Sequence, residues 1–287
     1  MKPAPFAYAA AESLDEALAL LGEAGEDAKL LAGGQSLLPL LAYRLARPSH
    51  VIDIGAVHGL DGLEVRDGCL HVGALVRHAA LERCDLNGAW QALREAASLI
   101  GHLPIRVRGT FGGSLAHADP AGELGVVATA LDADIVLRSA RGERTVPAGE
   151  FFVAPLTTAA EPDEVLTEAR FAAPGAGFRS VFEEFSPRVG DFAYASVAAG
   201  CRVGADGTAR DVRIALGSVG PTPIRAGAAE RALSGSAFDD DAIAECARLA
   251  AGACDEAAGD WHADGAYRRA LVVSLLTRAL TRLRAQP

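Results

Sequence analysis

The spacing of apolar residues predicts a small α/β unit at the start of the chain. Over residues 14–21 the apolar positions recur every three or four residues, which is typical of a helix with one buried face. Short apolar runs at 29–31 and 51–54 have the length of buried strands, and a second helical run, 37–45, lies between them. Strand, helix and strand in this order predict one unit that covers residues 1–55.

A second unit, residues 56–175, mixes alternating strand patterns with amphipathic helices. Its predicted elements are hairpin strands at 63–65 and 70–72, helices at 89–100 and 124–131, and strands at 134–139, 144–147 and 165–171. The aromatic stretch Phe151–Pro155 reads as a loop. Residues 174–177, Pro-Gly-Ala-Gly, then form the clearest linker in the chain.

The pattern changes after this linker. Strands are predicted at 178–185, 195–203 and 212–219, and helices follow at 226–233, 241–253 and 267–284. Strands followed by helices predict a small antiparallel sheet covered by a helical layer, in a third part that covers residues 178–287.

Composition places the chain among globular proteins and restricts its partners. Half of the 287 residues are hydrophobic, yet no apolar run is long enough to span a bilayer. Residues 1–6 show no apolar signal-peptide core, so a cytoplasmic location is expected. The net charge of −10 argues against nucleic acid, which needs a basic footprint.

The cysteines indicate neither disulfides nor a metal site. The five are Cys69, Cys84, Cys201, Cys246 and Cys254, an odd number with no C-x-x-C pair. Iron–sulfur clusters need thiolates close together, and these are scattered. Any iron–sulfur centre that exchanges electrons with this protein is therefore expected in another chain.

Two Gly-Gly loops carry the candidate chemistry. The first, Gly33-Gly34, follows the strand at 29–31, and Ser36 is expected to cap the next helix. The second, Gly112-Gly113, comes before Asp119-Pro120, which is expected to start the helix through 124–131 with Asp as the cap. Glycines free to adopt positive φ ahead of a helix gather backbone N–H groups that suit a phosphate.

One such loop is typical of a simple turn, but two can hold both phosphates of a pyrophosphate. Neither loop matches the P-loop or the G-x-G-x-x-G spacing of the Rossmann fold. Because the net charge repels a dinucleotide at long range, such a site has to rely on local N–H donors.

The two loops also resemble a known family. Ala32-Gly33-Gly34-Gln35-Ser36 and Thr110-Phe111-Gly112-Gly113-Ser114 are similar to the paired FAD loops of molybdenum hydroxylase flavoprotein subunits. These are the medium subunits of the carbon monoxide dehydrogenase and xanthine dehydrogenase family. The segments 105–110, I-R-V-R-G-T, and 188–193, R-V-G-D-F-A, resemble further motifs of that family. The likeness covers nearly the whole chain in order, spacing and length.

The resemblance implies an α+β fold with FAD in a cleft of its first two parts. A two-part α/β FAD-binding domain of the PCMH/VAO-like type, residues 1–55 and 56–175, would precede a small antiparallel sheet plus helical C-terminal domain, residues 178–287. The residues expected to contact FAD are Lys29, Leu30, Leu31, Ala32, Gly33, Gly34, Gln35, Ser36 and Leu37 in a first wall, Thr110, Gly112, Gly113 and Ser114 in a second, and Ile100, Gly101, His117, Asp119, Glu123 and Leu166 around them.

Several of these residues also have a purely structural explanation. Glu123 would accept hydrogen bonds from the sugar or ribityl hydroxyls of FAD, but a carboxylate in a helix's first turn is equally favoured by the macrodipole. Asp119 is more simply a helix cap, and His117 is as readily structural as flavin-lining. Ile100, Gly101 and Leu166 read as core positions when the resemblance is set aside.

The chain departs from the family pattern at three places. Ser114 and Val107 stand where Asn is common, and Glu183 with Glu184 stands where relatives with an NAD site often carry Lys. A glutamate near a flavin does not favour the reduced anion as a cation does. This argues against NAD as the terminal acceptor and leaves a quinone, oxygen or a carrier protein open.

The function implied by the resemblance is electron transfer. FAD accepts single electrons and passes on one or two, which suits a relay between one-electron clusters and a final acceptor. No H-E-x-x-H or G-x-S-x-G motif is present, so we assign no catalytic residue and no metal ligand to this chain. The implied assembly is a dimer of heterotrimers, with a large molybdenum–pterin subunit that oxidises the substrate and a small subunit with two 2Fe-2S clusters.

Two other functions compete with this one. A flavin-free scaffold subunit would keep the fold and bind only partners, but the intact glycines of both loops argue against it. A stand-alone FAD oxidase of related fold would need a larger substrate domain than the segment after Gly177 provides.

Overall fold

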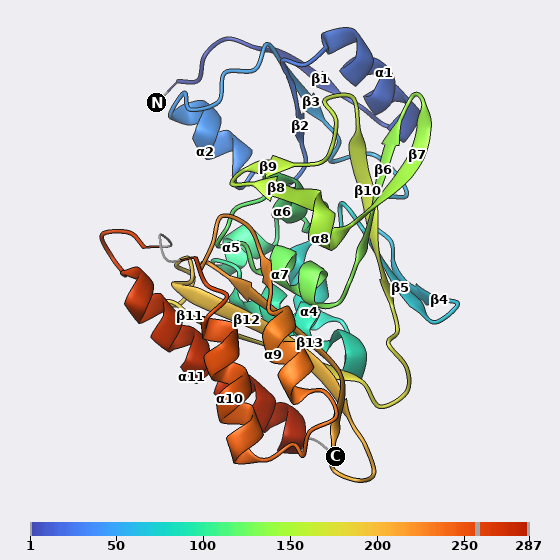
Figure 1. Cartoon of the computed structure of the whole chain (residues 1–287). Coiled ribbons are helices and arrows are strands. Elements are labelled where there is room, and N and C mark those ends of the chain that lie inside the picture. Colours follow the sequence, from blue (N-terminus) through green and yellow to red (C-terminus); the bar gives the residue numbers. More distant parts are fainter. Residues whose placement is uncertain (1, 256–258, 286–287) are drawn as a thin grey trace.

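The three groups of elements predicted from the sequence lie one after another along the molecule (Figure 1). The computed structural model describes residues 2–255 and 259–285, so the outermost ends of the first and third predicted parts, residues 1 and 286–287, lie outside the described residues. Mixed helices and sheets in this order confirm the predicted α+β class.

The first sheet has three parallel strands. Its order is β1-β3-β2, with β1 at Ala7–Ala10, β2 at Ala28–Leu31 and β3 at His50–Asp53, and helices α1 (Leu14–Ala24) and α2 (Leu37–Ala42) connect the strands. Ser13 caps α1 by accepting from the Glu16 N–H at 3.2 Å. The predicted helix 37–45 is three residues too long, because Arg44 takes a left-handed φ of 59°. Ser36 stands at the cap position of α2 but makes no side-chain capping bond.

The second sheet is antiparallel, in the order β4-β5-β10-β6-β7. Its strands are β4 (Leu63–Arg66), β5 (Cys69–Gly73), β6 (Asp134–Ser139), β7 (Gly142–Pro147) and β10 (Val165–Ala172). The hairpin turn uses positive φ at Asp67 and Gly68, which twists it to match the strands. The helices of this part are α3 (His78–Arg83), α4 (Gln91–Leu99), α5 (Leu103–Arg106), α6 (Phe111–His117), α7 (Glu123–Ala130) and α8 (Ala148–Phe151), with a 3₁₀ turn at Gly88–Trp90.

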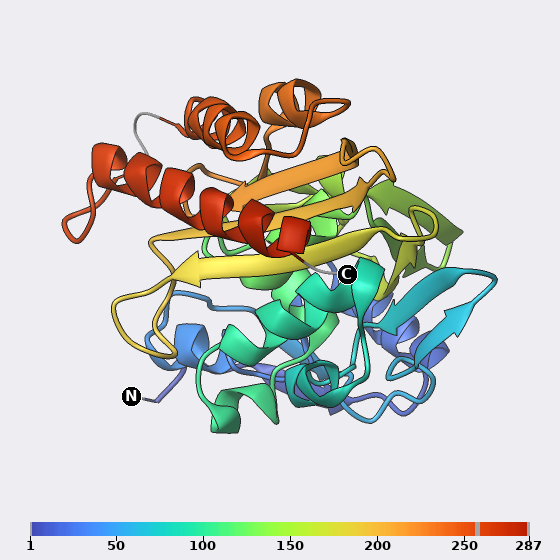
Figure 2. The same cartoon turned by 90° about the horizontal axis from the view of Figure 1, so that it is seen from below.

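The third sheet is antiparallel in the order β11-β12-β13-β14 and lies between two helical layers. Its strands are β11 (Arg179–Phe185), β12 (Ala195–Val203), β13 (Ala209–Gly217) and β14 (Ile224–Arg225). One face packs against α9 (Gly227–Leu233) and α11 (Gly265–Ala285), which also contacts α10 (Asp240–Ala251). The other face rests on α4 and α7 (Figure 2). Every residue of α7 is buried, so this helix joins the second and third parts.

Two predictions about the helices of the second part are wrong. Gly112 and Gly113 are not in a loop but in the first turn of α6, because the buried side chains of Phe111 and Leu115 stabilise a helix there against the glycine propensity. Asp119 is not the cap of α7, which begins at Glu123 after Gly122. Asp119 instead closes a turn, in which its Oδ1 accepts from the Ala121 N–H at 2.9 Å.

The stretch predicted as an aromatic loop is also ordered differently. Phe151 ends α8, and β8 (Phe152–Ala154) pairs with β9 (Thr157–Thr158) in a small separate sheet. Phe151 is fully buried and packs edge-on against Phe152, with ring centroids 5.2 Å apart. Burial of this aromatic pair, which local sequence pattern does not reveal, explains the regular structure.

Candidate functional site

The two glycine segments, far apart in the sequence, contact each other through their backbones. A Cβ atom on Gly33 would lie 2.8 Å from the Gly109 Cα and still closer to the Arg108 carbonyl oxygen. No side chain fits at this contact, so the first loop lies directly against the residues that lead into Thr110. We call this contact between Gly33 and residues 108–109 the glycine junction.

The first loop presents free backbone donors at this junction. Within the part of the chain that the structure describes, the N–H groups of Gly33, Gly34, Gln35 and Ser36 donate to no protein acceptor. Gly34 takes a φ of 75°, which turns the chain sharply. Consecutive N–H groups in such a turn form a concave anion-binding nest.

The second segment is built differently from the prediction. The Gly112 N–H donates to the Ala74 carbonyl at 2.9 Å, and the Gly113 N–H donates to Thr110 Oγ1 at 3.2 Å. Neither glycine has a positive φ. A Cβ on Gly112 would lie 2.7 Å from the Ala74 Cα, so Gly112 is required for close helix–strand packing and not as a phosphate donor.

A buried histidine that the sequence analysis missed supports this segment. His78 Nε2 lies 2.9 Å from the Thr110 carbonyl oxygen and 3.2 Å from Ser114 Oγ. Burial, assisted by the charges of Arg106 and Arg77, lowers the pKa of His78 to about 4, against a raising effect of the Thr110 bond. The imidazole is therefore neutral at neutral pH and holds Thr110 and Ser114 in position.

Two arginines bring positive charge to the junction. Arg77 Nη1 donates to the Arg108 carbonyl, the same oxygen that a Gly33 side chain would strike. Burial and then the charge of Arg108 lower the pKa of Arg77, while Asp53 raises it. Local cations therefore lie beside the backbone donors, in a chain whose net charge is −10.

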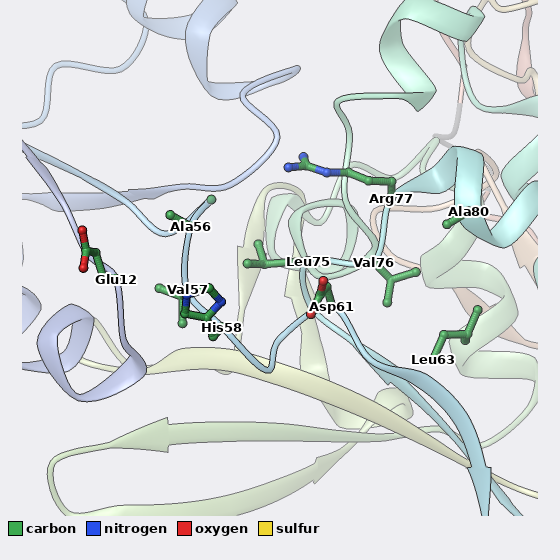
Figure 3. Close-up of a pocket in the computed structure, with 11 residues that line it drawn as sticks. Glu12, Ala56, Val57, His58, Asp61, Leu63, Leu75, Val76, Arg77 and Ala80 are labelled. Atoms are coloured by element: carbon green, nitrogen blue, oxygen red, sulfur yellow. The ribbon is translucent and has the colours of Figure 1, made fainter.

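A pocket of about 630 Å³ opens next to Arg77 (Figure 3). It reaches the first loop through Gly55, where an added Cβ would lie 3.9 Å from the Ala32 carbonyl oxygen. None of its lining residues was predicted from the sequence, since they come from four separate segments. They are Glu12, Gly55, Ala56, Val57, His58, Asp61, Leu63, Leu75, Val76, Arg77 and Ala80.

The turn at Ile100–Gly101 meets a segment of the third part. Gly101 takes a φ of 47°, and Arg106 Nη1 donates to its carbonyl at 3.0 Å. A Cβ on Gly190 would lie 3.1 Å from the Gly101 carbonyl carbon. The segment 188–193, singled out in the sequence, thus lies on the predicted site, with Val189 and Phe192 85% and 66% exposed.

Comparison with known proteins shows the family to which this chain belongs. Residues 4–172 match the family described as FAD binding domain in molybdopterin dehydrogenase, and residues 180–283 match the CO dehydrogenase flavoprotein C-terminal domain. The chain belongs to the FAD-binding subunits of the molybdopterin dehydrogenases. This confirms the resemblance drawn from the glycine loops.

Relatives match along almost their entire length. The chain is 39% identical over 290 residues to the 6-hydroxypseudooxynicotine dehydrogenase complex subunit alpha of Paenarthrobacter nicotinovorans, covering all of this chain and 98% of the relative. It is 37% identical to the carbon monoxide dehydrogenase medium chain of Hydrogenophaga pseudoflava, covering 98% and 97%. The structure of reconstituted CO dehydrogenase from Oligotropha carboxidovorans superposes with a TM-score of 0.94 at 32% identity, over 100% of both chains.

The cofactor of this flavoprotein family is FAD, and the junction has the chemistry to hold it. Free N–H donors and two guanidinium groups suit a pyrophosphate, and glycines allow its close approach to the backbone. The positive charge of Arg77 and Arg108 and the free N–H groups of the first loop are therefore both compatible with FAD binding.

Of the remaining predicted residues, Glu123 and Leu166 are buried, and His117 and Asp119 lie beside each other. Glu123 starts α7 and is only 8% exposed, and burial raises its pKa to about 7. His117 Nε2 lies 3.8 Å from Asp119 Oδ2, so these two residues pair with each other. Leu166 is buried on β10 opposite Leu137, in the main hydrophobic core of the flavoprotein.

Proposed function

We propose that this chain is the FAD-binding, electron-transferring subunit of a multi-subunit molybdenum-containing dehydrogenase. The observation that carries the proposal is the first glycine loop, which has four free N–H groups and whose Gly33 lies against the backbone of Arg108 and Gly109. Family membership supplies the cofactor, FAD, which accepts single electrons and passes them on. This chain's own task is to bind the cofactor, orient it and shield it.

The pyrophosphate of FAD is assigned to the first loop. Gly33, Gly34, Gln35 and Ser36 donate N–H groups, and the side chains of Arg77 and Arg108 add positive charge. The Arg77 guanidinium, whose pKa the charge of Arg108 lowers, gains from an anion placed beside both groups. We keep the other predicted contacts as part of the proposed site: Lys29, Leu30, Leu31, Ala32 and Leu37 in the first wall, Thr110, Gly112, Gly113 and Ser114 in the second, and Ile100, Gly101, His117, Asp119, Glu123 and Leu166 around them.

The complex provides the remaining redox centres. The large subunit carries molybdenum–pterin and oxidises the substrate, and the small subunit carries the 2Fe-2S clusters. Relatives named as a dehydrogenase complex subunit and as a carbon monoxide dehydrogenase medium chain support this assembly. We propose a dimer of heterotrimers, with residues 1–55 and 56–175 of this chain around FAD and residues 178–287 closing over it.

Two properties of the chain bear on the proposed location of the complex. No helix in residues 2–255 and 259–285 combines the length and apolar character needed to cross a bilayer. The five cysteines are all unpaired, which is typical of a reducing compartment. We propose that the complex is cytoplasmic.

Absorbance spectroscopy of the purified full-length chain tests the proposed function. Flavin bands in the visible spectrum, with FAD released on denaturation, are expected for the wild type and for Gly149→Ala. Gly149 is a suitable control because an added Cβ there meets nothing within 4 Å. Gly33→Ala forces the two glycine segments apart and should weaken FAD binding at least tenfold, while circular dichroism shows the fold to be retained.

The alternatives give different results in the same experiment. A colourless wild-type chain that stays colourless in its native complex would refute the flavoprotein assignment and favour the scaffold subunit. Equal FAD affinity of Gly33→Ala and Gly149→Ala would place the cofactor away from the glycine junction.

A further inference from the structure

Large apolar side chains are exposed on three segments near the proposed flavin site. In the turn after α2, Tyr43 and Leu45 are 67% and 76% exposed. Leu103, the first residue of α5, and Val107, the residue after this helix, are both exposed. Val189 is exposed in the loop between β11 and β12. Single exposed apolar residues are normal on a protein surface, whereas a connected group of them marks an interaction site.

Backbone contacts join the three segments. Gly33, which lies four residues before α2, packs against the backbone of residues 108–109, just after α5. On the other side of α5, a Cβ on Gly190 would lie 2.8 Å from Nδ1 of His102, the residue that precedes this helix. Accordingly, α2, α5 and the loop after β11 lie on one side of the molecule, the left side in both Figure 1 and Figure 2. We call the exposed residues of segments 37–47, 103–107 and 188–192 the α2–α5 face.

The cofactor of the proposed function does not account for the whole α2–α5 face. Its pyrophosphate is assigned to residues 33–36, ahead of α2. Helix α2 extends for about 9 Å along its axis, so Tyr43 and Leu45 lie at the far end of this helix from the phosphate donors. These two side chains are therefore free to contact a partner that docks beside the cofactor.

The segments that form the α2–α5 face are basic, in a chain whose net charge is −10. Residues 35–48, 101–108 and 186–193 contain five arginines, no lysine or glutamate, and one acidic residue, Asp191. Phe192 adds an exposed aromatic ring. Protein interfaces are enriched in arginine and aromatic residues and depleted of lysine and glutamate, so this composition is typical of an interface.

Three exposed arginines of these segments have no ion-pair partner. Arg44 Nε donates to the Lys2 carbonyl at 3.2 Å, and Arg47 Nε donates to the Arg44 carbonyl at 3.0 Å. Arg188 lies next to Val189 in the exposed loop. Within the part of the chain that the structure describes, no carboxylate forms an ion pair with any of the three arginines. The α2–α5 face therefore presents positive charge that suits a negatively charged partner.

The iron–sulfur subunit of the same complex has the properties that this face requires. A 2Fe-2S cluster held by cysteine thiolates carries a net negative charge in both of its redox states. Electron transfer to FAD also requires a cluster close to the cofactor, so the subunit that carries the cluster has to dock beside the flavin site. The large molybdenum subunit has no such requirement, because its electrons reach the flavin through the clusters.

We propose that the α2–α5 face is the docking surface for the iron–sulfur subunit. Tyr43 and Leu45 supply apolar contact area, and Arg44, Arg47 and Arg188 face the negative charge of that subunit. The position of FAD beside this face rests on the proposed function, through the first glycine loop. The docking surface itself rests on the connected apolar residues and on the unpaired arginines.

Titration of the full-length chain, loaded with FAD, with the purified iron–sulfur subunit tests the proposal. We would measure the dissociation constant by calorimetry for the wild type, for Leu45→Asp and for the double variant Arg44→Glu with Arg47→Glu. Leu45→Asp should raise this constant at least about tenfold, because it places a charge in the apolar contact. The double variant should raise it at least about tenfold at low salt and by less at high salt, because salt screens the attraction between charges.

Two matched control variants lie away from the α2–α5 face. Val65→Asp on β4 introduces the same carboxylate at a residue that is 55% exposed, and Arg231→Glu reverses the charge of an exposed arginine in the last turn of α9. Both elements lie away from α2 and α5 in Figures 1 and 2. The two controls should bind the iron–sulfur subunit as the wild type does, and circular dichroism should show every variant to be folded.

FAD titration of each variant, followed by flavin fluorescence, separates docking from cofactor binding. Weaker binding of the iron–sulfur subunit with unchanged FAD affinity would support the docking surface. Wild-type dissociation constants for both face variants would overturn it, and so would variants that lose FAD but keep the iron–sulfur subunit. A face that binds the large subunit or a second copy of this chain in place of the iron–sulfur subunit would overturn it as well. A wild type that binds no FAD would refute the proposed function instead, and the same titrations on the chain without FAD would then decide the docking surface separately.

Discussion

Replacement of Arg268 by Met should loosen the connection between the third sheet and the flavin site. The Arg268 guanidinium, 8% exposed, donates to the Tyr194 carbonyl at 2.7 Å and to the Ser218 carbonyl at 2.8 Å. Tyr194 directly follows the segment that rests on Gly101. Ser218 in turn binds Pro120, just ahead of α7. One side chain thus ties two site-forming segments together.

The size of the effect can be worked out from these contacts. Methionine fills most of the space of the arginine stem but leaves three carbonyl oxygens, those of Ala263, Tyr194 and Ser218, without their donor. Each buried acceptor that loses its partner costs about 1–3 kcal/mol. The bond to Asp260, which is half exposed, adds at most about 1 kcal/mol. We expect the free energy of unfolding to fall by at least about 3 kcal/mol in total.

Urea unfolding at pH 7 measures this loss, and Arg248→Met is the control. Arg248 also lies on a helix of the third part, but its partner is the neighbouring Glu245 and both are largely exposed. That variant should lose no more than about 0.5 kcal/mol. A loss below about 1 kcal/mol for Arg268→Met, or losses equal in the two variants, would refute the reasoning that Arg268 satisfies these carbonyls.

Three further predictions concern stability. Thr110→Ala removes the cap of α6 and should cost about 1 kcal/mol, measured by thermal or urea unfolding against Thr110→Ser, which keeps the hydroxyl that accepts from Gly113. Burial raises the pKa of Glu164, but the bond from Arg144 outweighs burial and lowers this pKa overall. Glu164→Gln should therefore cost about 1–3 kcal/mol of unfolding free energy at pH 7. This cost should vanish as the pH falls below the ordinary Glu value and through the lower folded one, and a constant cost from pH 3 to 7 would contradict the pairing. Gly22→Ala in α1, where an added Cβ meets nothing, should stabilise by about 0.5–1 kcal/mol, and a destabilised variant in a calorimetric scan would contradict this.

Elements with a long, regular hydrophobic period were predictable from the sequence. The helix Gly265–Ala285 and the strand Ala195–Val203 agree with the predictions to within two residues, because the helix buries one apolar stripe and the strand is a continuous buried run over residues 195–201. β1 (Ala7–Ala10) was missed because three of its four residues are exposed and show no alternation. It is stabilised by its parallel partner β3, some 40 residues away, which no local pattern records.

The candidate site was likewise predicted only in part from the sequence. Both glycine pairs were predicted to offer backbone donors, but only the first pair has free N–H groups, because Gly112 and Gly113 donate theirs inside the protein. Arg77 and His78 gave no local signal. Their partners, the carbonyls of residues 108 and 110, are 31 and 32 positions away in the sequence, so only the folded chain brings them together.

The adjacent glutamates Glu183 and Glu184 show what strand periodicity predicts about two neighbouring side chains. Both were read from the sequence as negative charges near a flavin, with the same consequence for the acceptor. The strand at 178–185 was predicted, and its period of two already requires that the two side chains point to opposite faces. Glu183 forms ion pairs with two arginines of α11, whereas Glu184 Oε2 is buried without a hydrogen-bond partner. Burial and then the charge of Glu123 raise the pKa of Glu184 to about 8, so this carboxyl group is mostly protonated at neutral pH and ionises only as the pH rises further.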